Sequence, residues 1–251
     1  MILSELLRGV TYKELKGSAD IEVSGLTYDS RSVSEGYCFF AVAGTVVDGH
    51  NFIGKAIEGG AKAGDTLLVT GGNSGLASVM IPMAKAFGIR VITTVRSEEK
   101  KEAILSWGAD RIVNTSEESL AEVLRAEQEN GRGVDLAIDC LGSRDVGECL
   151  PYLNRGARWI MIASLAGDLT EVNLKTVYVR GIRLIGSTLR SRAPKVKAEI
   201  LAKLVKDVWP KVESGEVKPT IYKVLPITEA EVAHDILYKG ENVGKVVLSV
   251  G

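Results

Sequence analysis

Residues 66–95 read TLLVTGGNSGLASVMIPMAKAFGIRVITTV, and this stretch decides the fold. An apolar run, Thr66–Thr70, leads into a glycine-rich loop, then into a helical pattern, Ser78–Phe87, and then into a second apolar run. Strand, glycine-rich loop, helix and strand within about 30 residues indicate a βαβ unit whose helix N-terminus receives a phosphate group. A glycine turn without a ligand is the alternative interpretation of this loop.

The same alternation continues to residue 187. Six apolar runs are separated by helical segments, and they read TLLVT, RVITTV, RIV, VDLAIDC, ARWIMIAS and IRLIGS. Strands that alternate with helices predict right-handed crossovers and a parallel sheet. Several runs are apolar at consecutive positions, which is typical of strands covered by helices on both faces. We therefore predict an α/β fold with a Rossmann-type, doubly wound parallel sheet.

The two ends of the chain follow other patterns. Residues 1–60 contain two short extended stretches, Ile21–Thr27 and Tyr37–Val42, and a helical pattern, Asn51–Glu58. After the sixth run, residues 193–215 predict a long helix that Pro210 kinks or breaks. A strand, a helix and a last strand are expected over residues 220–225, 228–238 and 245–250. We predict a small α/β segment, residues 1–62, ahead of a larger domain, residues 63–251, with a helix-strand tail.

Composition excludes several function classes. Thirty-one basic and 32 acidic residues give a net charge of −1, so no broad basic face is expected for nucleic acid. Cys38, Cys140 and Cys149 lack paired metal-site spacings, and buried, reduced thiols in a cytoplasmic protein fit them best. The start resembles no signal peptide, and no apolar run reaches the ~18 residues of a membrane span. His50 and His234 lie far apart, so neither a metal cluster nor a catalytic residue is predicted.

The end of the second apolar run addresses which nucleotide the loop would receive. Sites for NAD usually carry an acidic residue here, which binds the ribose 2′-hydroxyl. This chain instead has Arg96 and Ser97, followed by two glutamates and then Lys100. Ser97 could also cap the next helix, and Lys100 could be a solvated surface lysine. The pattern favours NADP over NAD.

Residues 64–251 resemble the cofactor half of zinc-independent quinone oxidoreductases, the zeta-crystallin-like group of the medium-chain dehydrogenase/reductase superfamily. The matching strings are GDTLLVTGGNSG, AKAFGIRVITTVRSEEK, GADRIVN, GVDLAIDCLG, GSTLRSR and VGKVVLSV. The resemblance implies binding of NADP(H) by three groups of residues: Gly72, Ser74, Gly75 and Leu76 at the pyrophosphate, Ser97 and Lys100 near the 2′-phosphate, and Cys140 to Gly142 along the nicotinamide. Ala77 and Thr115 depart from the family pattern, which usually has a glycine and a tyrosine there.

Residues 1–62 resemble an unrelated family, the Mur ligases of peptidoglycan assembly, in their N-terminal domain. The matching strings are LSELL, VSGLTYDSRSVSEGYCFFAVAGT and DGHNFIGKAIEGGAKA. The resemblance implies a pocket for a uridine diphosphate group formed by Tyr28, Ser30 and the loop that begins at Thr45. Turn and capping residues are the alternative reading of these positions. No GxxxxGK[ST] loop for ATP occurs in the sequence, which argues against ligation.

Together these observations suggest a chimera of two partial enzymes, recombinant or designed. Three functions stay open: an NADP(H)-binding module with little or no turnover, a working NADPH-dependent quinone reductase, and a structural chimera whose nucleotide site is vestigial. The stretch Ile182–Gly186 carries one charge and no proline, so it is a poorly protected edge strand. We expect it to pair across a two-fold axis in a homodimer that buries Ile182, Leu184 and Ile185.

Overall fold

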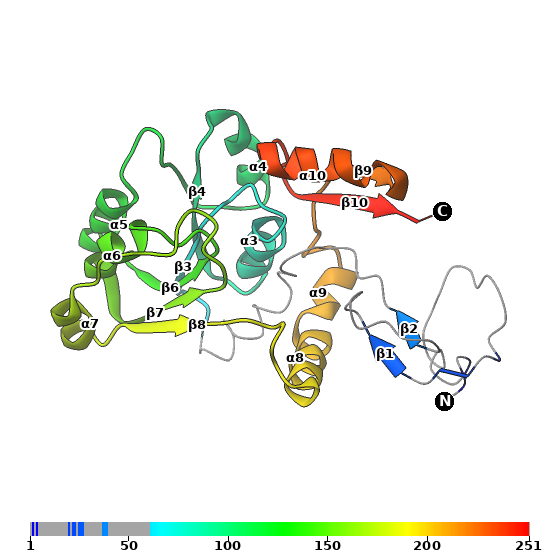
Figure 1. The fold of residues 1–251 in the computed structure, drawn as a ribbon. Coiled ribbons are helices and arrows are strands. Elements are labelled where there is room, and N and C mark those ends of the chain that lie inside the picture. Colours follow the sequence, from blue (N-terminus) through cyan, green and yellow to red (C-terminus); the bar gives the residue numbers. More distant parts are fainter. Residues whose placement is uncertain are drawn as a thin grey trace. The chain divides into compact units, whose positions relative to one another are not determined.

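The computed structural model describes residues 61–250 and, in the N-terminal part, positions 2, 4, 20, 22, 23, 25–27 and 37–39. The chain divides into two compact units, Met1–Thr45 and Val46–Gly251 (Figure 1). In the first unit, β1 (Gly25–Thr27) pairs in parallel with β2 (Tyr37–Phe39), within the two stretches predicted to be extended. The expected helix Asn51–Glu58 and the candidate residues Tyr28, Ser30 and Thr45 lie outside the described residues. The expected boundary after residue 62 stays a prediction.

The second unit is built on a six-stranded sheet with the order β5-β4-β3-β6-β7-β8. All five strand pairs are parallel. The strands are β3 (Thr66–Val69), β4 (Arg90–Val95), β5 (Arg111–Asn114), β6 (Val134–Asp139), β7 (Leu153–Met161) and β8 (Arg183–Gly186). The strand order reverses between β3 and β6, and ligands of such sheets bind beyond the carboxyl ends of the strands at this switch point. The predicted doubly wound Rossmann-type sheet is confirmed.

Helices cover both faces of this sheet. They are α3 (Ala77–Ala86), α4 (Lys101–Ser106), α5 (Leu120–Glu129), α6 (Asp145–Cys149), α7 (Leu174–Arg180), α8 (Pro194–Asp207) and α9 (Trp209–Glu213). Neighbouring residues of β3 belong to opposite cores: Leu67 packs with residues of α3 and α8, and Leu68 packs with residues of α5 and α6. All four residues of β3 are buried. This burial on both faces explains the consecutive apolar residues in the sequence.

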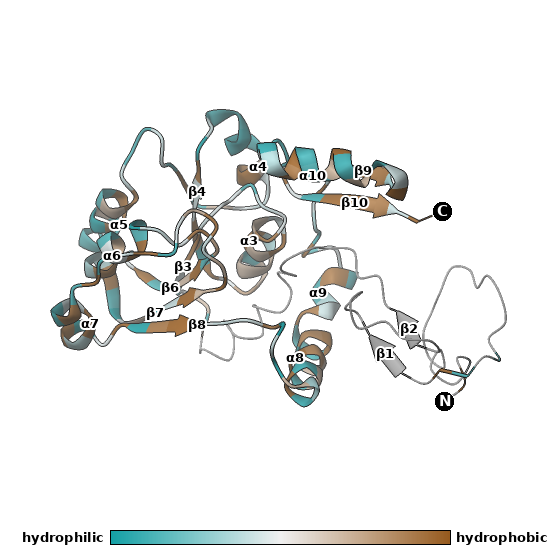
Figure 2. Ribbon diagram, in the orientation of Figure 1, coloured by the Kyte–Doolittle hydropathy of each residue, from teal (hydrophilic) through white to brown (hydrophobic). Residues whose placement is uncertain are grey.

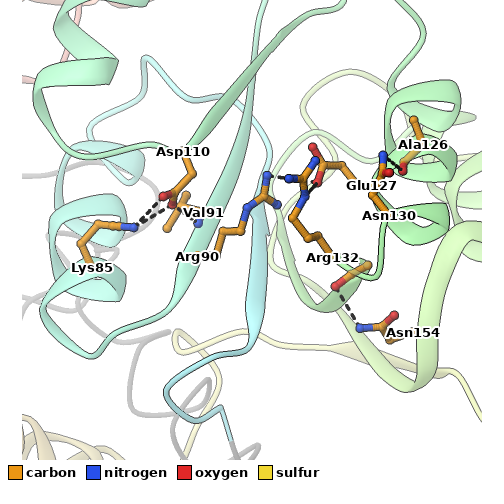
Figure 3. A network of polar contacts seen from close by, with 10 residues as sticks. Lys85, Arg90, Val91, Asp110, Ala126, Glu127, Asn130, Arg132 and Asn154 are labelled. Atoms are coloured by element: carbon orange, nitrogen blue, oxygen red, sulfur yellow. Dashed lines mark hydrogen bonds and ion pairs between the residues drawn. The ribbon is translucent and has the colours of Figure 1, made fainter.

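Polar contacts close the amino ends of the strands (Figure 3). Asp110 accepts hydrogen bonds from the Lys85 ammonium at 2.7 Å and from the backbone N–H of Val91 at 2.7 Å. The carboxylate of Glu127 pairs with Arg90 at 3.1 Å and with Arg132 at 3.0 Å. Most of these groups are paired with one another, although Nη1 of Arg90 is buried without a partner among the described residues.

The helical segment after β8 is divided into two helices, α8 and α9. Helix α8 ends at Asp207, and Pro210 lies in the first turn of the separate helix α9, where proline is tolerated. The predicted break is therefore present. Strands β9 (Ile221–Pro226) and β10 (Lys245–Ser249) form a parallel pair, and α10 (Ala230–Lys239) connects them.

Strand β8 lies at one edge of the six-stranded sheet, as expected for Ile182–Gly186. Leu184 is exposed and Ile185 is half-buried, and Figure 2 draws this strand largely in the hydrophobic colour. The expectation that Ile182 would be buried by a second copy is wrong. Ile182 is 5% exposed in the single chain, because it belongs to the hydrophobic core on one face of the sheet.

Candidate functional site

The loop between β3 and α3, residues 71–76, is pressed against β4. The backbone N–H of Gly72 donates to the Thr94 carbonyl at 2.7 Å, and the N–H of Gly71 donates to the Thr94 hydroxyl at 3.0 Å. A Cβ atom on Gly72 would lie 2.5 Å from Oγ1 of Thr93, so only glycine fits. The lack of a side chain at Gly72 therefore allows the loop to lie against β4, and the backbone N–H of Gly72 is already hydrogen-bonded.

Donors remain at the first turn of α3. The Ser74 hydroxyl accepts a hydrogen bond from the N–H of Ala77 at 3.1 Å, and the Ser74 carbonyl accepts from the N–H of Ser78. The N–H groups of Gly75 and Leu76 have no acceptor among the described residues. Unpaired amides at a helix N-terminus bind anions, and the helix dipole adds to the attraction. Gly75 and Leu76 thus offer two free donors at the start of the helix, while Ser74 is bonded to its first turn.

The departure at Ala77 is compatible with this arrangement. Ala77 is completely buried in the core beside β3, where a small side chain permits close contact between helix and strand. Thr115, the second departure, is exposed just beyond β5, and its hydroxyl donates to the Val95 carbonyl at 3.2 Å.

The carboxyl end of β4 gathers positive charge. Lys100 donates to the Gly240 carbonyl at the end of α10, and Arg96 is exposed beside it. Burial, and then the charge of Arg96, lower the pKa of Lys100 from its ordinary value. Ser97 makes no side-chain capping bond, so its alternative role as a cap is not seen. Glu98 pairs with Lys101 at 2.6 Å. The strand end therefore offers two cations and a hydroxyl to an anion.

Asp139 organises the carboxyl end of β6. It is 1% exposed, and its Oδ1 accepts hydrogen bonds from the Thr70 hydroxyl at 2.7 Å and from the backbone N–H groups of Leu141 and Gly142 at 2.9 and 3.1 Å. Its Oδ2 accepts from the indole N–H of Trp159 at 3.0 Å. A carboxylate so fully bonded holds the loop after β6 in place and is not a catalytic group.

The loop held by Asp139 contains two predicted nicotinamide neighbours, Cys140 and Gly142. The Cys140 thiol donates to the Thr70 carbonyl at 3.4 Å, and burial raises the pKa of this thiol to about 11. Burial likewise raises the pKa of Cys149. Gly142 has a φ of 68°, and a Cβ atom there would lie 2.5 Å from the Gly167 carbonyl oxygen. Cys140 therefore packs as a neutral thiol, and the close approach of Gly167 requires a glycine at position 142.

A cavity of about 410 Å³ lies beyond the carboxyl ends of β6, β7 and β8. Its lining includes Gly142, Met161, Ile162 and Leu169. The cavity is next to the loop that Asp139 holds, on the side of the switch point opposite Lys100. Among the described residues no three His, Cys, Asp or Glu side chains gather as metal ligands.

The sequence reasoning missed the contribution of the tail to this site. Asn73 in the phosphate loop donates from its side chain to the Asn242 carbonyl at 3.2 Å, and its own carbonyl accepts from the N–H of Gly244 at 3.1 Å. The run ENVG, residues 241–244, marks a turn in the sequence, but a local turn signal does not say which distant loop it contacts.

Two family descriptions match the chain. The model of the zinc-binding dehydrogenases matches residues 75–206, and that of the Mur ligase family, catalytic domain, matches residues 22–127. The resemblance to the dehydrogenases is thereby confirmed at the level of the family. The weaker Mur ligase match agrees with the second predicted resemblance, although it is to the catalytic domain and extends past residue 62 to residue 127. The UDP-binding role proposed for the N-terminal part stays a prediction.

Curated relatives cover the same part of the chain. The quinone oxidoreductase of Rattus norvegicus is 29% identical over 189 residues, which are 75% of this chain and 55% of the relative. The NAD-dependent alcohol dehydrogenase of Sulfurisphaera tokodaii is 30% identical over 73% of this chain and 50% of the relative. The chain thus spans about half the length of the curated relatives it matches.

Solved structures share the fold. The quinone oxidoreductase of Thermus thermophilus, solved alone and with NADPH, superimposes with a TM-score of 0.69 at 23% identity over 80% of this chain and 63% of that one. An alcohol dehydrogenase structure from Sinorhizobium meliloti gives a TM-score of 0.67 at 26% identity over 83% and 57% of the two chains.

Proposed function

Because the chain belongs to the zinc-binding dehydrogenase family, we propose that its larger domain is an NADP(H)-binding module with little or no turnover of its own. The observation that carries this proposal is that the amides of Gly75 and Leu76, at the N-terminus of α3, have no acceptor in the part of the chain that the structure describes. In the proposal these amides bind the pyrophosphate, and Gly72 and Ser74 shape the loop around it. Ser97 and Lys100 bind the 2′-phosphate, and Cys140 and Gly142 lie along the nicotinamide. When bound, the cofactor supplies a hydride.

The first test is nucleotide preference. We expect NADPH to bind more tightly than NADH, because Lys100 and Arg96 together favour the dianionic 2′-phosphate over a hydroxyl group. Lys100→Ala should reduce NADPH affinity about tenfold, the usual scale for a hydrogen bond to a charged group, with little effect on NADH. Fluorescence titration of both nucleotides measures the two dissociation constants.

Lys101→Ala is the matched control, since it removes the same charge from the next residue, whose ammonium already pairs with Glu98. The pH dependence gives an independent check. The pKa of Lys100 is lowered, so the ammonium loses its proton at a lower pH than an ordinary lysine. The preference for NADPH should therefore decline toward alkaline pH, and it should decline less in Lys100→Ala. Equal affinities for NADPH and NADH in the unmodified chain would contradict the assignment.

A working quinone reductase is the second candidate function, and the cavity beside Gly142 favours it. Hydride transfer needs a substrate held within reach of the nicotinamide, and an apolar cavity at the carboxyl ends of the strands could hold a ring. A steady-state assay with NADPH and a small quinone separates the two candidates, because turnover well above background would favour the enzyme. If NADPH fails to raise the melting temperature, the third reading, a structural chimera with a vestigial site, gains support.

We further propose that the protein is a chimera, because the Mur ligase match begins at residue 22 and the dehydrogenase match at residue 75, with an overlap over residues 75–127. Its N-terminal part would then retain a uridine diphosphate pocket at Tyr28, Ser30 and Thr45. We place the protein in the cytoplasm on account of its buried thiols, Cys140 and Cys149. No helix within the described ranges is long and apolar enough to cross a membrane.

We also propose that β8 forms a homodimer by pairing with its copy. An edge strand leaves backbone groups on one side without partners in its own sheet, and Leu184 of β8 is 38% exposed. Leu184→Lys should convert the dimer to a monomer near the 26.9 kDa chain mass, because the substitution places two ammonium groups in one isologous contact. Sedimentation at micromolar concentration measures both species. Leu105→Lys, on the exposed face of α4, is the control, and a monomeric unmodified chain would refute the dimer.

A further inference from the structure

Two arginines lie side by side on the six-stranded sheet, toward the amino ends of its last strands. Arg158 of β7 and Arg183, the first residue of β8, are directly paired in the parallel register. Neighbouring strands are about 4.8 Å apart, and side chains at paired positions point to the same face. Ile160, two residues after Arg158, belongs to the core formed with residues of α3 and α8, and Ile185 packs against the same core. Both arginines therefore lie on this face of the sheet, with their guanidinium groups next to each other.

Arg158 is a buried cation without a bonded partner. It is only 6% exposed, yet its guanidinium makes neither an ion pair nor a hydrogen bond in the part of the chain that the structure describes. Buried charges are normally paired, because an unpaired one loses its hydration without compensation. Among the described residues, the fully buried side-chain nitrogens that lack a partner belong to Arg90 and Arg180, so the nitrogens of Arg158 keep contact with solvent. A ligand from solution can therefore reach this unsatisfied group.

The carboxylates that act on Arg158 from a distance are bonded elsewhere. Asp135 accepts hydrogen bonds from the backbone N–H of Thr66 at 2.9 Å and from the side-chain amide of Asn154 at 2.7 Å. Asp65 accepts from a backbone N–H three residues before it at 3.1 Å. Burial lowers the pKa of Arg158, and the charge of the paired arginine lowers it further, while Asp65 and Asp135 act in the opposite direction. The repulsion between the two arginines is therefore not relieved by a direct ion pair.

From this geometry we infer that Arg158 and Arg183 together bind a phosphate group. Two guanidinium groups match the charge of a phosphate dianion, and each can donate two parallel N–H bonds to its oxygens. Like charges directly opposite each other in a sheet are destabilising, so a bound anion also removes this repulsion. The site is separate from the proposed nucleotide site, because the β3–α3 loop and Lys100 follow the carboxyl ends of their strands. The inference therefore does not depend on the proposed function.

The test is calorimetric titration of the whole chain with inorganic phosphate. Arg183→Gln should weaken phosphate binding about tenfold, the usual scale for a hydrogen bond to a charged group. Arg158→Lys keeps the charge but loses the paired donors, so it should also bind phosphate more weakly. Arg155→Gln is the matched control, since it removes the same charge from β7, at a side chain that donates to the Val179 carbonyl at 3.0 Å. It should change the affinity by less than about twofold, because salt screens a charge outside the site.

A second titration with glycerol 3-phosphate identifies the source of the phosphate group. An affinity equal to that of inorganic phosphate means that the two arginines recognise the phosphate group alone. Tighter binding of the ester assigns the site to a phosphorylated small molecule. Acetate at the same ionic strength is the control for general screening, and it should give no saturable binding.

The melting temperature separates a binding role from a structural one. Without phosphate, Arg183→Gln should melt at the same or a higher temperature, because it removes a like charge beside Arg158. Phosphate should raise the melting temperature of the unmodified chain more than that of this variant. The inference is overturned if Arg183→Gln binds phosphate as tightly as the unmodified chain, or if the unmodified chain binds none at millimolar concentrations. It is also overturned if saturating NADPH abolishes phosphate binding, since phosphate then occupies the nucleotide site. A chain that binds phosphate at these arginines but no NADPH would contradict the proposed function and support this inference.

Discussion

Replacement of Asp139 by alanine is expected to lower the free energy of unfolding by about 3–5 kcal/mol. The carboxylate is 1% exposed and accepts hydrogen bonds from Thr70, Trp159 and the N–H groups of residues 141 and 142. Alanine would leave the indole and backbone donors without acceptors inside the protein, and each such buried group costs about 1–3 kcal/mol. Urea unfolding followed by circular dichroism measures the change.

Two further variants make the result specific to these hydrogen bonds. Asp139→Asn keeps an acceptor at Oδ1 but presents an amide to Trp159, so its loss of stability should be smaller than that of Asp139→Ala. Asp207→Ala, at the exposed end of α8, should change stability by less than about 0.5 kcal/mol. A loss below about 1 kcal/mol in Asp139→Ala would mean that the loop after β6 finds other acceptors.

The architecture was predictable from the sequence because its signals are local. Strand, loop and helix succeed one another within residues 66–95, and β3, α3 and β4 lie where the pattern placed them. The break at Pro210 is local as well, since proline lacks the N–H that a helix interior needs.

The contacts that shape the candidate site were not predictable, because they join residues far apart in the sequence. Thr70 and Asp139 are 69 positions apart, and Lys100 and Gly240 are 140 apart. The sequence pattern predicts that Asp139 ends a strand, but it does not predict that the indole N–H of Trp159 in the next strand donates a hydrogen bond to its carboxylate. For the same reason Ile182 was assigned to an intermolecular contact, although it is already buried in the core of the single chain.

Gly72→Ala is expected to reduce NADPH affinity at least tenfold and to lower the free energy of unfolding by about 1–3 kcal/mol. The new Cβ atom would lie 2.5 Å from Oγ1 of Thr93 and 3.0 Å from the Thr94 carbonyl oxygen. Thr93 cannot rotate away without losing its hydrogen bond to the Val69 carbonyl at 2.7 Å. The loop must therefore move off β4, which displaces the amides of Gly75 and Leu76. Titration with NADPH and urea unfolding measure the two effects.

A second substitution tests whether this contact is the cause. Thr93→Ala removes the nearer clashing atoms, although by itself it loses one buried hydrogen bond and about 1 kcal/mol of stability. In the double variant, Gly72→Ala with Thr93→Ala, the loss of stability should be smaller than the sum of the losses in the two single variants. Part of the NADPH affinity should also return. The rescue should be incomplete, since the Thr94 carbonyl remains 3.0 Å from the new methyl group. Strictly additive losses would show that crowding against Thr93 does not explain why position 72 is a glycine.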